Sequence, residues 1–335
     1  MQVLRKLLFP FSLIYGFVIY LRNFFYNVGI LKSISYKVPL ICIGNLSVGG
    51  TGKTPMTEFL ISLLKDSYKV AVLSRGYKRK SKGFVLANNT TSVEEIGDEP
   101  FQYHQKFDNI HIAVDADRRN GIDRLQEIVN PDVILLDDAF QHRKVKAGLN
   151  ILLTVYNDLY VNDLILPAGN LRDSKREAKR ADIIVVTKCP QHISVVEKEI
   201  VIKKIQPKSN QKVFFTAINY DDKLQSINKN MSIEHLKDKK FMLVTGIAKP
   251  KPLVNYLKEK GFDFDHLNFP DHHNFNDTEI EAIRKSSNLI ITTEKDFVRL
   301  NNKVDNLFYI KIKPSFLFDG INEFSACITN FLKRH

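Results

Sequence analysis

The amino-acid sequence predicts an α/β fold, with a mostly parallel sheet followed by a second, smaller α/β domain. Short β-branched runs alternate with helical patterns, as they do when each parallel strand is followed by a crossover helix. Six runs come first, at residues 40–43, 70–73, 110–114, 133–136, 151–154 and 183–187. After a polar stretch near residues 203–211, four more lie at residues 213–218, 241–245, 289–292 and 307–312. We therefore expect domains at residues 31–212 and 213–335, preceded by a helix within residues 1–30.

A glycine-rich loop follows the first predicted strand and opens a helix with an apolar face. Its glycines would let backbone N–H groups surround a polyphosphate, Lys53 could reach the outer phosphates, and the Thr54 hydroxyl could bind Mg²⁺. The usual G-x-x-x-x-G-K-[ST] spacing would place glycine at position 47, where this chain has Ser47. Strand, loop, Lys-Thr pair and helix in this order nevertheless indicate a phosphate-binding loop and a P-loop NTPase-like domain. The candidate nucleotide-binding residues are Ser47, Val48, Gly49, Gly50, Thr51, Gly52, Lys53 and Thr54.

Two pairs of carboxylates are candidates for the chemistry. One predicted strand ends in Asp137 and Asp138, a Walker B arrangement in which Asp137 takes the Mg²⁺ position and Asp138 orients a ligand or supports the metal. The turn at residues 97–100 carries Asp98 and Glu99, and its closing proline keeps them out of the middle of a helix. Phosphoryl transfer to an alcohol needs a carboxylate near the attacking hydroxyl and oxygen ligands for a metal, and these two acids could divide the tasks. An ordinary surface turn is the alternative.

Two adjacent histidines, His272 and His273, lie between aromatic residues late in the chain. Adjacent side chains point in different directions, so the pair suits a hydrogen bond to a carboxylate, which could orient a base, better than a shared metal. With no cysteine or third histidine nearby, we expect no zinc site. The three cysteines, Cys42, Cys189 and Cys327, are far apart in the sequence, which predicts free thiols and a reducing compartment.

The N-terminal segment is basic and apolar. The chain has a net charge of +12 and a pI near 9.4, and its first acidic residue is Glu58. Residues 7–21 are uncharged and rich in aromatic side chains, but they fall short of the roughly 20 residues that span a bilayer. A helix lying in the interface of an anionic inner leaflet fits this pattern best, and a helix buried in the core is the alternative. A signal peptide is disfavoured because no small-residue cleavage site follows. A nucleic-acid partner does not need this many Phe and Leu residues, so we expect none.

Several short segments, in a fixed order along the chain, form a highly specific pattern. They are Gly44-Asn45, Gly49-Gly50-Thr51-Gly52-Lys53-Thr54-Pro55, Leu73-Ser74-Arg75-Gly76-Tyr77, Gly97-Asp98-Glu99-Pro100, Leu136-Asp137-Asp138-Ala139-Phe140-Gln141-His142-Arg143, Leu166-Pro167-Ala168-Gly169, Thr245-Gly246-Ile247-Ala248, Phe269-Pro270-Asp271-His272-His273 and Thr293-Glu294-Lys295-Asp296. Through these segments the chain resembles the tetraacyldisaccharide 4′-kinase family, the lipid A kinases of Gram-negative bacteria, over nearly its full length.

The resemblance implies that ATP phosphorylates the 4′-hydroxyl of a tetraacylated glucosamine disaccharide 1-phosphate, giving the bis-phosphorylated lipid A precursor lipid IVA. Because this substrate stays in the inner membrane, the enzyme would sit on the cytoplasmic face of that membrane, as a peripheral or monotopic protein. Residues 1–30 would then be an amphipathic membrane-associating helix, residues 31–212 the ATP-binding kinase domain, and residues 213–335 a domain that closes over the active site. No obligate protein partner is evident.

The resemblance also implies roles for individual residues. Asp98 would be the general base, assisted by His272, although the adjacent His273 is the alternative. Lys53 and Mg²⁺ would stabilise the transferred phosphoryl group. The implied catalytic residues are Asp98, His272 and Asp138, and the implied metal ligands are Thr54, Glu99 and Asp137. The family pattern commonly has glutamate where this chain has Asp173, and we leave that residue outside the predicted site.

Two other functions remain open at this stage. The first is a membrane-binding ATPase or GTPase of the switch type. Against GTP, Val186-Thr187-Lys188-Cys189-Pro190 matches the guanine-binding signature Asn-Lys-x-Asp only in part. The second is a nucleotide-dependent membrane adaptor, in which the acidic turn and the histidines are structural. An adaptor would bind ATP tightly without turnover that depends on an acceptor.

Overall fold

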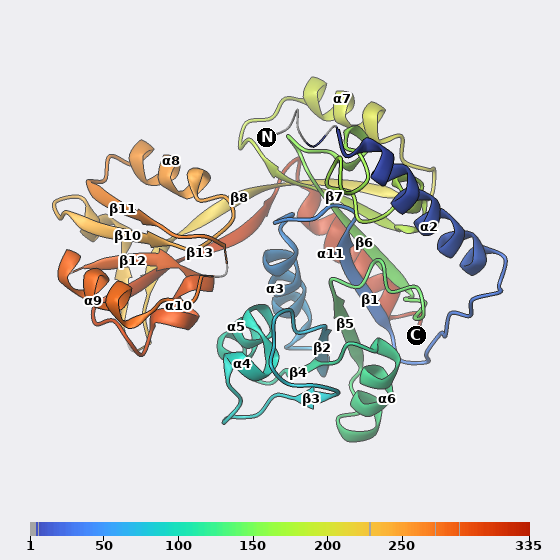
Figure 1. Cartoon of the computed structure of the whole chain (residues 1–335), viewed down its shortest axis with the longest axis horizontal. Helices are drawn as coiled ribbons and strands as arrows, with labels where there is room; N and C mark the ends of the chain where they lie inside the picture. Colours follow the sequence, from blue (N-terminus) through green and yellow to red (C-terminus); the bar gives the residue numbers. More distant parts are fainter. Residues whose placement is uncertain (1–4, 6, 228, 272, 288) are drawn as a thin grey trace. The chain divides into compact units, whose positions relative to one another are not determined.

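The computed structural model describes residues 5, 7–227, 229–271, 273–287 and 289–335. The chain forms two compact units (Figure 1). The first unit comprises Met1–Ile218 and Pro314–His335, and the second unit comprises Asn219–Lys313.

The first unit is built on a sheet with the strand order β8-β7-β6-β1-β5-β2-β4-β3, in which only β3 is antiparallel to its neighbour. The strands are β1 (Leu40–Asn45), β2 (Val70–Ser74), β3 (Val85–Leu86), β4 (His111–Val114), β5 (Val133–Asp137), β6 (Leu149–Val155), β7 (Ile183–Cys189) and β8 (Lys212–Gln225). All six strands predicted for this part are confirmed. The central strands are buried on both faces, which explains why they appear in the sequence as unbroken apolar runs.

Helices cover both faces of this sheet, and each face has its own apolar core. The helices are α3 (Lys53–Leu64), α4 (Val93–Ile96), α5 (Asp98–Lys106), α6 (Arg118–Ile128), α7 (Val195–Ile205) and α11 (Gly320–Leu332), with short 3₁₀ turns at Tyr160–Asn162 and Lys175–Arg180. Side chains of α3 and α11 share one core, and side chains of α6 and α7 share the other. Parallel strands need such crossover helices on their faces, so the predicted α/β class is confirmed.

The boundary between the units differs from the expected one between residues 212 and 213, because β8 begins beside β7 in the first unit and continues into the second. The C-terminal segment also belongs to the first unit. Helix α11 buries Phe324, Ile328 and Leu332 in a core of that unit. These side chains recur every four residues, so they form one apolar face that needs a partner, and the first sheet provides it.

The second unit contains a smaller parallel sheet in the order β11-β10-β12-β13, and β13 is followed in that order by β8. Its strands are β9 (Asn230–Ser232), β10 (Phe241–Thr245), β11 (Phe264–Asn268), β12 (Ile290–Thr293) and β13 (Leu307–Phe316), and its helices are α8 (Lys251–Glu259), α9 (Asp277–Ser286) and α10 (Glu294–Leu300), with a 3₁₀ turn at Ile233–Leu236. The four strands predicted for residues 213–335 are confirmed, as β10, β12 and β13 in this unit and, for residues 213–218, as part of β8. Strand β11 was not predicted, because it lies at the edge of the sheet and its half-exposed polar side chains give no apolar run.

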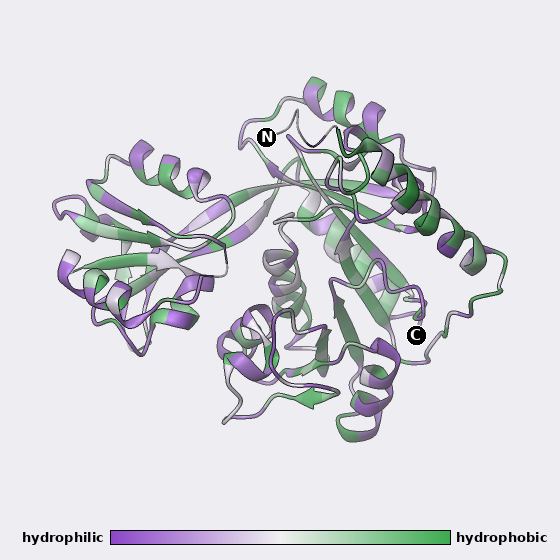
Figure 2. Ribbon diagram, in the orientation of Figure 1, coloured by the Kyte–Doolittle hydropathy of each residue, from purple (hydrophilic) through white to green (hydrophobic). Residues whose placement is uncertain are grey.

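In helix α2 (Phe9–Asn27), the polar side chains are buried and the apolar ones exposed, the opposite of an ordinary surface helix. Its buried residues, Ser12 and Asn23, are polar and only 5% and 4% exposed, while Phe11 and Phe17 are each 61% exposed. Figure 2 shows how apolar this helix is along most of its length. The alternative of a helix buried in the core is therefore wrong. Among the described residues, no helix is both long enough and apolar enough to cross a bilayer.

Candidate active site

The glycine-rich loop connects β1 to α3, as predicted, with Lys53 as the first residue of the helix. Gly49 and Gly52 have φ angles of +101° and +92°, in the left-handed region that glycine adopts at little cost. Ser47 instead forms an antiparallel bridge with Leu171. An extended residue has room for a side chain, so this position does not require glycine, which explains the departure from the usual spacing.

Neighbouring segments fix the backbone of this loop through its carbonyl groups. At the end of β7, Thr187 Oγ1 donates a hydrogen bond to the carbonyl of Thr51 at 2.7 Å, and Lys188 Nζ donates one to the carbonyl of Gly50 at 2.6 Å. Asn45 Nδ2 donates to Thr51 Oγ1 at 2.8 Å. Apart from the partial match to a guanine-binding signature, nothing in the sequence indicates these roles. Parallel strands, however, bring their carboxyl ends to one edge of a sheet, and β7 ends at that edge.

Asp137 and Asp138 stand at the carboxyl end of β5, beside β1, and their environments differ. Asp137 is buried and accepts a hydrogen bond of 3.5 Å from Thr57 Oγ1. Burial and the adjacent charge of Asp138 raise the pKa of Asp137 to about 6. Asp138 lies 3.8 Å from Lys53 Nζ and accepts hydrogen bonds of 2.7 and 3.1 Å from the Arg172 guanidinium.

Burial alone would raise the pKa of Asp138, but Lys53 and Arg172 together outweigh it and lower that pKa below its usual value. Asp138 is therefore kept ionised by its cationic neighbours, whereas the ionised form of Asp137 would be stabilised if a cation bound to it. Such divergence between adjacent acids is typical of catalytic sites. Nothing in the sequence pairs Arg172 with Asp138, which is 34 positions away.

The acidic turn at residues 97–100 forms the first turn of α5, with Gly97 as its N-cap at φ +88°. Asp98 is buried there, where the positive end of the helix dipole favours a carboxylate. Glu99 contributes to the raised pKa of Asp137, which places its charge near the end of β5. Tyr103, which sequence reasoning missed, is fully buried on the same helix, and its pKa is raised well above the usual value by burial and by the charges of Asp137 and nearby glutamates.

His272, the predicted partner of Asp98, lies outside the described residues. Its neighbour His273 is in the second unit, where His273 Nε2 lies 2.9 Å from Glu279 Oε2. The His273 ring stacks on Phe269 and meets the edge of Phe275, with centroid distances of 4.9 and 5.1 Å. This histidine is therefore held by contacts of its own unit.

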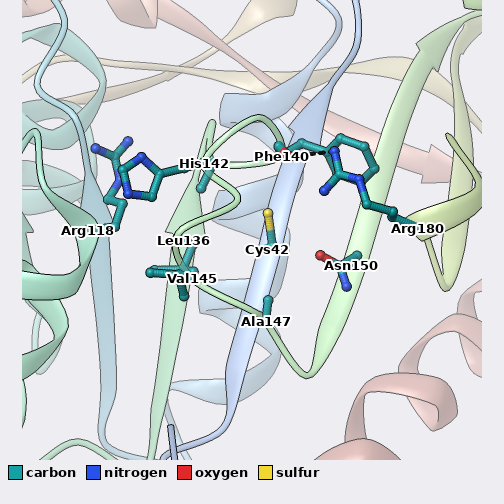
Figure 3. A pocket seen from close by; sticks show the side chains of 10 residues that line it. Cys42, Arg118, Leu136, Phe140, His142, Val145, Ala147, Asn150 and Arg180 are labelled. Carbon is teal, nitrogen blue, oxygen red and sulfur yellow. Dashed lines mark hydrogen bonds between the residues drawn. The ribbon is translucent and has the colours of Figure 1, made fainter. Parts of the chain in front are cut away.

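A cavity of about 20 Å³ lies behind the end of β5 (Figure 3). Arg118 and His142 line one side of it, and among the described residues Arg118 Nε and His142 Nε2 have no hydrogen-bond partner. Burial lowers the pKa of His142 to about 4, so its imidazole is neutral. The volume suits about one water molecule and excludes a nucleotide. Cys42 also lines this cavity, and burial raises the pKa of its thiol to about 12, as expected for a core residue rather than a nucleophile.

The buried Arg118 also supports the end of β5. Its guanidinium donates hydrogen bonds of 2.6 Å to the carbonyl of Asp115 and 3.4 Å to the carbonyl of Asp137. This role cannot be recognised in the sequence, because both acceptors are backbone groups.

The oxygen donors near the loop fit a hard divalent cation. In the described part of the chain, no group of three or more His, Cys, Asp or Glu side chains is placed to hold a metal ion. Mg²⁺ does not need one, because it usually binds one or two carboxylates, with phosphate oxygens and water completing its shell. Thr54, at the start of α3, and Asp137, at the end of β5, supply donors of this kind.

Comparisons with known proteins agree with this geometry. Residues 4–333 match the family described as tetraacyldisaccharide-1-P 4′-kinase. The tetraacyldisaccharide 4′-kinase of Flavobacterium psychrophilum is 51% identical over 340 residues, covering 99% of this chain and 98% of that protein. The enzyme of the same name from Bacteroides thetaiotaomicron is 46% identical over 316 residues, covering 89% and 83%.

Among solved structures, the crystal structure of LpxK from Aquifex aeolicus in complex with ATP has a TM-score of 0.81 and 32% sequence identity. The match covers 98% of this chain and 99% of that chain. A family match over nearly all of the sequence and relatives of similar length together show that the chain belongs to the tetraacyldisaccharide 4′-kinase family.

Proposed function

We propose that this kinase transfers the γ-phosphoryl group of ATP to the 4′-hydroxyl of a tetraacylated glucosamine disaccharide 1-phosphate, forming lipid IVA. Membership of the family supports the reaction, and the ATP complex of the Aquifex relative supports the donor. The observation that carries the proposal is the position of Lys53, at the start of α3, 3.8 Å from Asp138 at the end of β5. This distance supports a P-loop site, in which the loop lysine binds the phosphates of a nucleoside triphosphate and an acid at the end of the neighbouring strand holds Mg²⁺.

The loop residues Ser47 to Thr54 would surround the phosphates of ATP, with Lys53 at the outer ones. Thr54, Glu99 and Asp137 would hold Mg²⁺, which when bound neutralises charge on the phosphates. Binding the cation would replace the proton that Asp137 holds below about pH 6. Asp138, kept ionised by Lys53 and Arg172, would in turn orient Lys53. Positioning and charge neutralisation should supply most of the rate enhancement.

Asp98 would accept the proton of the attacking 4′-hydroxyl, and His272 would orient it or take up that proton. The buried position of Asp98 in the first turn of α5 supports this role. His272 belongs by sequence to the second unit, so closure of that unit over the bound substrates would complete the site and exclude water.

The outward face of α2 would rest in the cytoplasmic leaflet of the inner membrane. Its exposed side chains are apolar, the chain has no acidic residue before Glu58, and the net charge is +12. Apolar burial combined with attraction to anionic lipids is how interfacial helices bind. The acceptor has four acyl chains, so the enzyme must meet it at a membrane surface.

The test is to incubate the full-length protein with Mg·ATP in mixed micelles, with and without the acceptor lipid, and to measure the mass of the lipid. We expect the mass of one phosphate to be added. Lys53→Met should abolish this gain. Lys65→Met, just after the other end of α3 and paired with Asp66 at the surface, should not. ATP hydrolysis that ignores the lipid would instead favour a switch-type ATPase.

A further inference from the structure

The polar face of α2 is joined to the body of the first unit by hydrogen bonds. Ser12 Oγ donates to the carbonyl of Ile165 at 3.0 Å and accepts from Ala168 N at 2.9 Å. Further along the helix, the buried Asn23 donates from Nδ2 to Asp173 Oδ1 at 2.7 Å. Polar contacts therefore hold this helix in place, while its apolar side chains face outward.

The Asn23–Asp173 contact is fully enclosed. Asp173 has no exposed surface, and its Oδ1 also accepts from Ser174 N at 2.8 Å. Its Oδ2 has no hydrogen-bond partner among the described residues. A buried acceptor without a partner costs free energy, and burial raises the pKa of this carboxyl. This cost must be offset by the surrounding structure, so the contact depends on the packing that holds Asn23 and Asp173 together.

The residue before Asp173 points the other way, towards the candidate active site. The Arg172 guanidinium binds both carboxylate oxygens of Asp138 and also donates to Asn45 Oδ1, at the start of the phosphate loop. The carbonyl of Arg172 accepts a hydrogen bond of 3.1 Å from the hydroxyl of Tyr15, which is on α2. The Arg172-Asp173 dipeptide thus contacts α2 on one side and the nucleotide site on the other.

A second connection from α2 reaches the same residue of the loop. Arg22 Nη2 donates to the carbonyl of Gln141 at 2.7 Å, and Gln141 Nε2 donates to the carbonyl of Asn45 at 2.6 Å. Two chains of contacts from one helix face therefore converge on Asn45. A shift of α2 would therefore change the contacts of Asn45, where the phosphate loop begins.

We propose that Asn23 and Asp173 are positioning residues for phosphoryl transfer, which couple the seating of α2 at the lipid surface to the Arg172 side chain that holds Asp138 and the phosphate loop. This rests on the proposed function, because it takes the outward face of α2 to be the lipid-binding face. Neither residue touches the reacting atoms. Their effect is to fix the geometry of groups that do, where small misplacements cost up to about 100-fold in rate.

Coupling between two sites is reciprocal. If vesicles tighten the binding of Mg·ATP by some factor, Mg·ATP must tighten the binding of vesicles by the same factor. The experiment uses the full-length protein and phosphatidylglycerol vesicles that lack the acceptor lipid. It measures Mg·ATP affinity with and without vesicles, and vesicle affinity by co-sedimentation with and without Mg·ATP. For the unmodified protein we expect both ratios to agree at about fivefold or more.

Asn23→Leu keeps the size of the side chain but removes its hydrogen bonds with Asp173 and Arg143. Both ratios should therefore fall to about one, although the protein still sediments with vesicles. Its kcat on the acceptor lipid should fall roughly tenfold or more, with less than about a threefold change in the KM for ATP. Asp173→Asn keeps the accepting Oδ1 and should retain the coupling, whereas Asp173→Leu should lose it. Tyr15→Phe removes one hydroxyl from the same connection, and it tests the coupling if Asn23→Leu does not fold.

Ser12→Ala is the matched control, because it removes hydrogen bonds of the same helix to the carbonyl of Ile165 and the amide of Ala168, and within the described part of the chain neither group is hydrogen-bonded to Asn45 or Arg172. In this variant, the Mg·ATP affinity ratio and the vesicle affinity ratio should both stay at the values of the unmodified protein. The proposal is overturned if Asn23→Leu keeps the full coupling, if Ser12→Ala loses as much, or if Asp173→Asn behaves like Asp173→Leu. Ratios of one in an unmodified protein that phosphorylates the lipid would also overturn it. Absence of lipid phosphorylation by the unmodified protein would instead count against the proposed function.

Discussion

Replacing Asp137 by Asn should make the nucleotide-free protein more stable at neutral pH while abolishing kinase activity. The pKa of Asp137 is raised from 3.8 to about 6. Between these values the native state holds a proton that the unfolded chain has lost, so stability falls as the pH rises from about 4 to 6. At about 1.4 kcal/mol per pKa unit, the loss comes to about 3 kcal/mol and stays constant above this window. An amide at position 137 has no charge to bury and therefore avoids this loss of stability.

The assay is thermal unfolding in EDTA, from pH 4.5 to 7.5, of the unmodified protein and Asp137→Asn. The two proteins should differ least at pH 4.5. At pH 7.5 the variant should melt roughly 6–12 °C higher, since about 1 kcal/mol corresponds to roughly 2–4 °C for a unit of this size. Mg·ATP should then raise the melting temperature of the unmodified protein but have less effect on the variant, which lacks the carboxylate that we propose as a ligand of Mg²⁺.

Asp138→Asn is the matched control, because it should have the opposite sign. Lys53 and Arg172 lower the pKa of Asp138, so its ionised form stabilises the native state above about pH 4 and this contribution is lost as the pH falls. Asp138→Asn should therefore be less stable than the unmodified protein at neutral pH. The reasoning fails if Asp137→Asn melts at or below the unmodified protein at pH 7.5, or if its advantage is the same at pH 4.5.

Three further outcomes are expected. Asp98→Ala should lower kcat roughly 10²–10⁴-fold with nucleotide affinity largely kept; turnover near the unmodified rate would remove Asp98 from the role of base. Gly44→Ala should lower stability by about 1–3 kcal/mol in urea unfolding, because its Cβ would lie 2.6 Å from Phe140 Cβ, whereas Gly16→Ala, with its nearest contact at 3.5 Å, should not. Phe17→Asp should weaken vesicle binding by about tenfold or more, through loss of about 1.5–3 kcal/mol of apolar burial, with an unchanged melting temperature; unchanged sedimentation would show that this face does not meet the lipid.

Local patterns in the sequence predicted the strands and the phosphate loop, because both are encoded by neighbouring residues. A buried parallel strand such as β5 is a short apolar run, and the acids after it must lie at the edge of the sheet where β1 also ends. The glycines of the loop, its lysine and its threonine are contiguous, so their roles could be predicted before any tertiary contact was known. The specific order of short segments then identified the family.

Contacts between distant positions could not be predicted in this way. Nothing near Arg172 in the sequence indicates that it binds Asp138, and nothing near Asn23 indicates that it donates to Asp173, 150 positions away. Periodicity reports that one face of a helix is apolar, but not whether that face is covered.

Helix α2 and helix α11 show the difference most clearly. Both are rich in apolar side chains, yet α11 buries its apolar face against the first sheet, while α2 presents polar side chains to the body of the protein and leaves its apolar ones exposed. By itself the sequence determined which segments form strands, which loop is expected to bind phosphate and which family the chain resembles. Only the tertiary structure decided which face of each helix is covered, where the two units divide and which arginine keeps Asp138 ionised, because those properties depend on partners brought together by folding rather than by sequence.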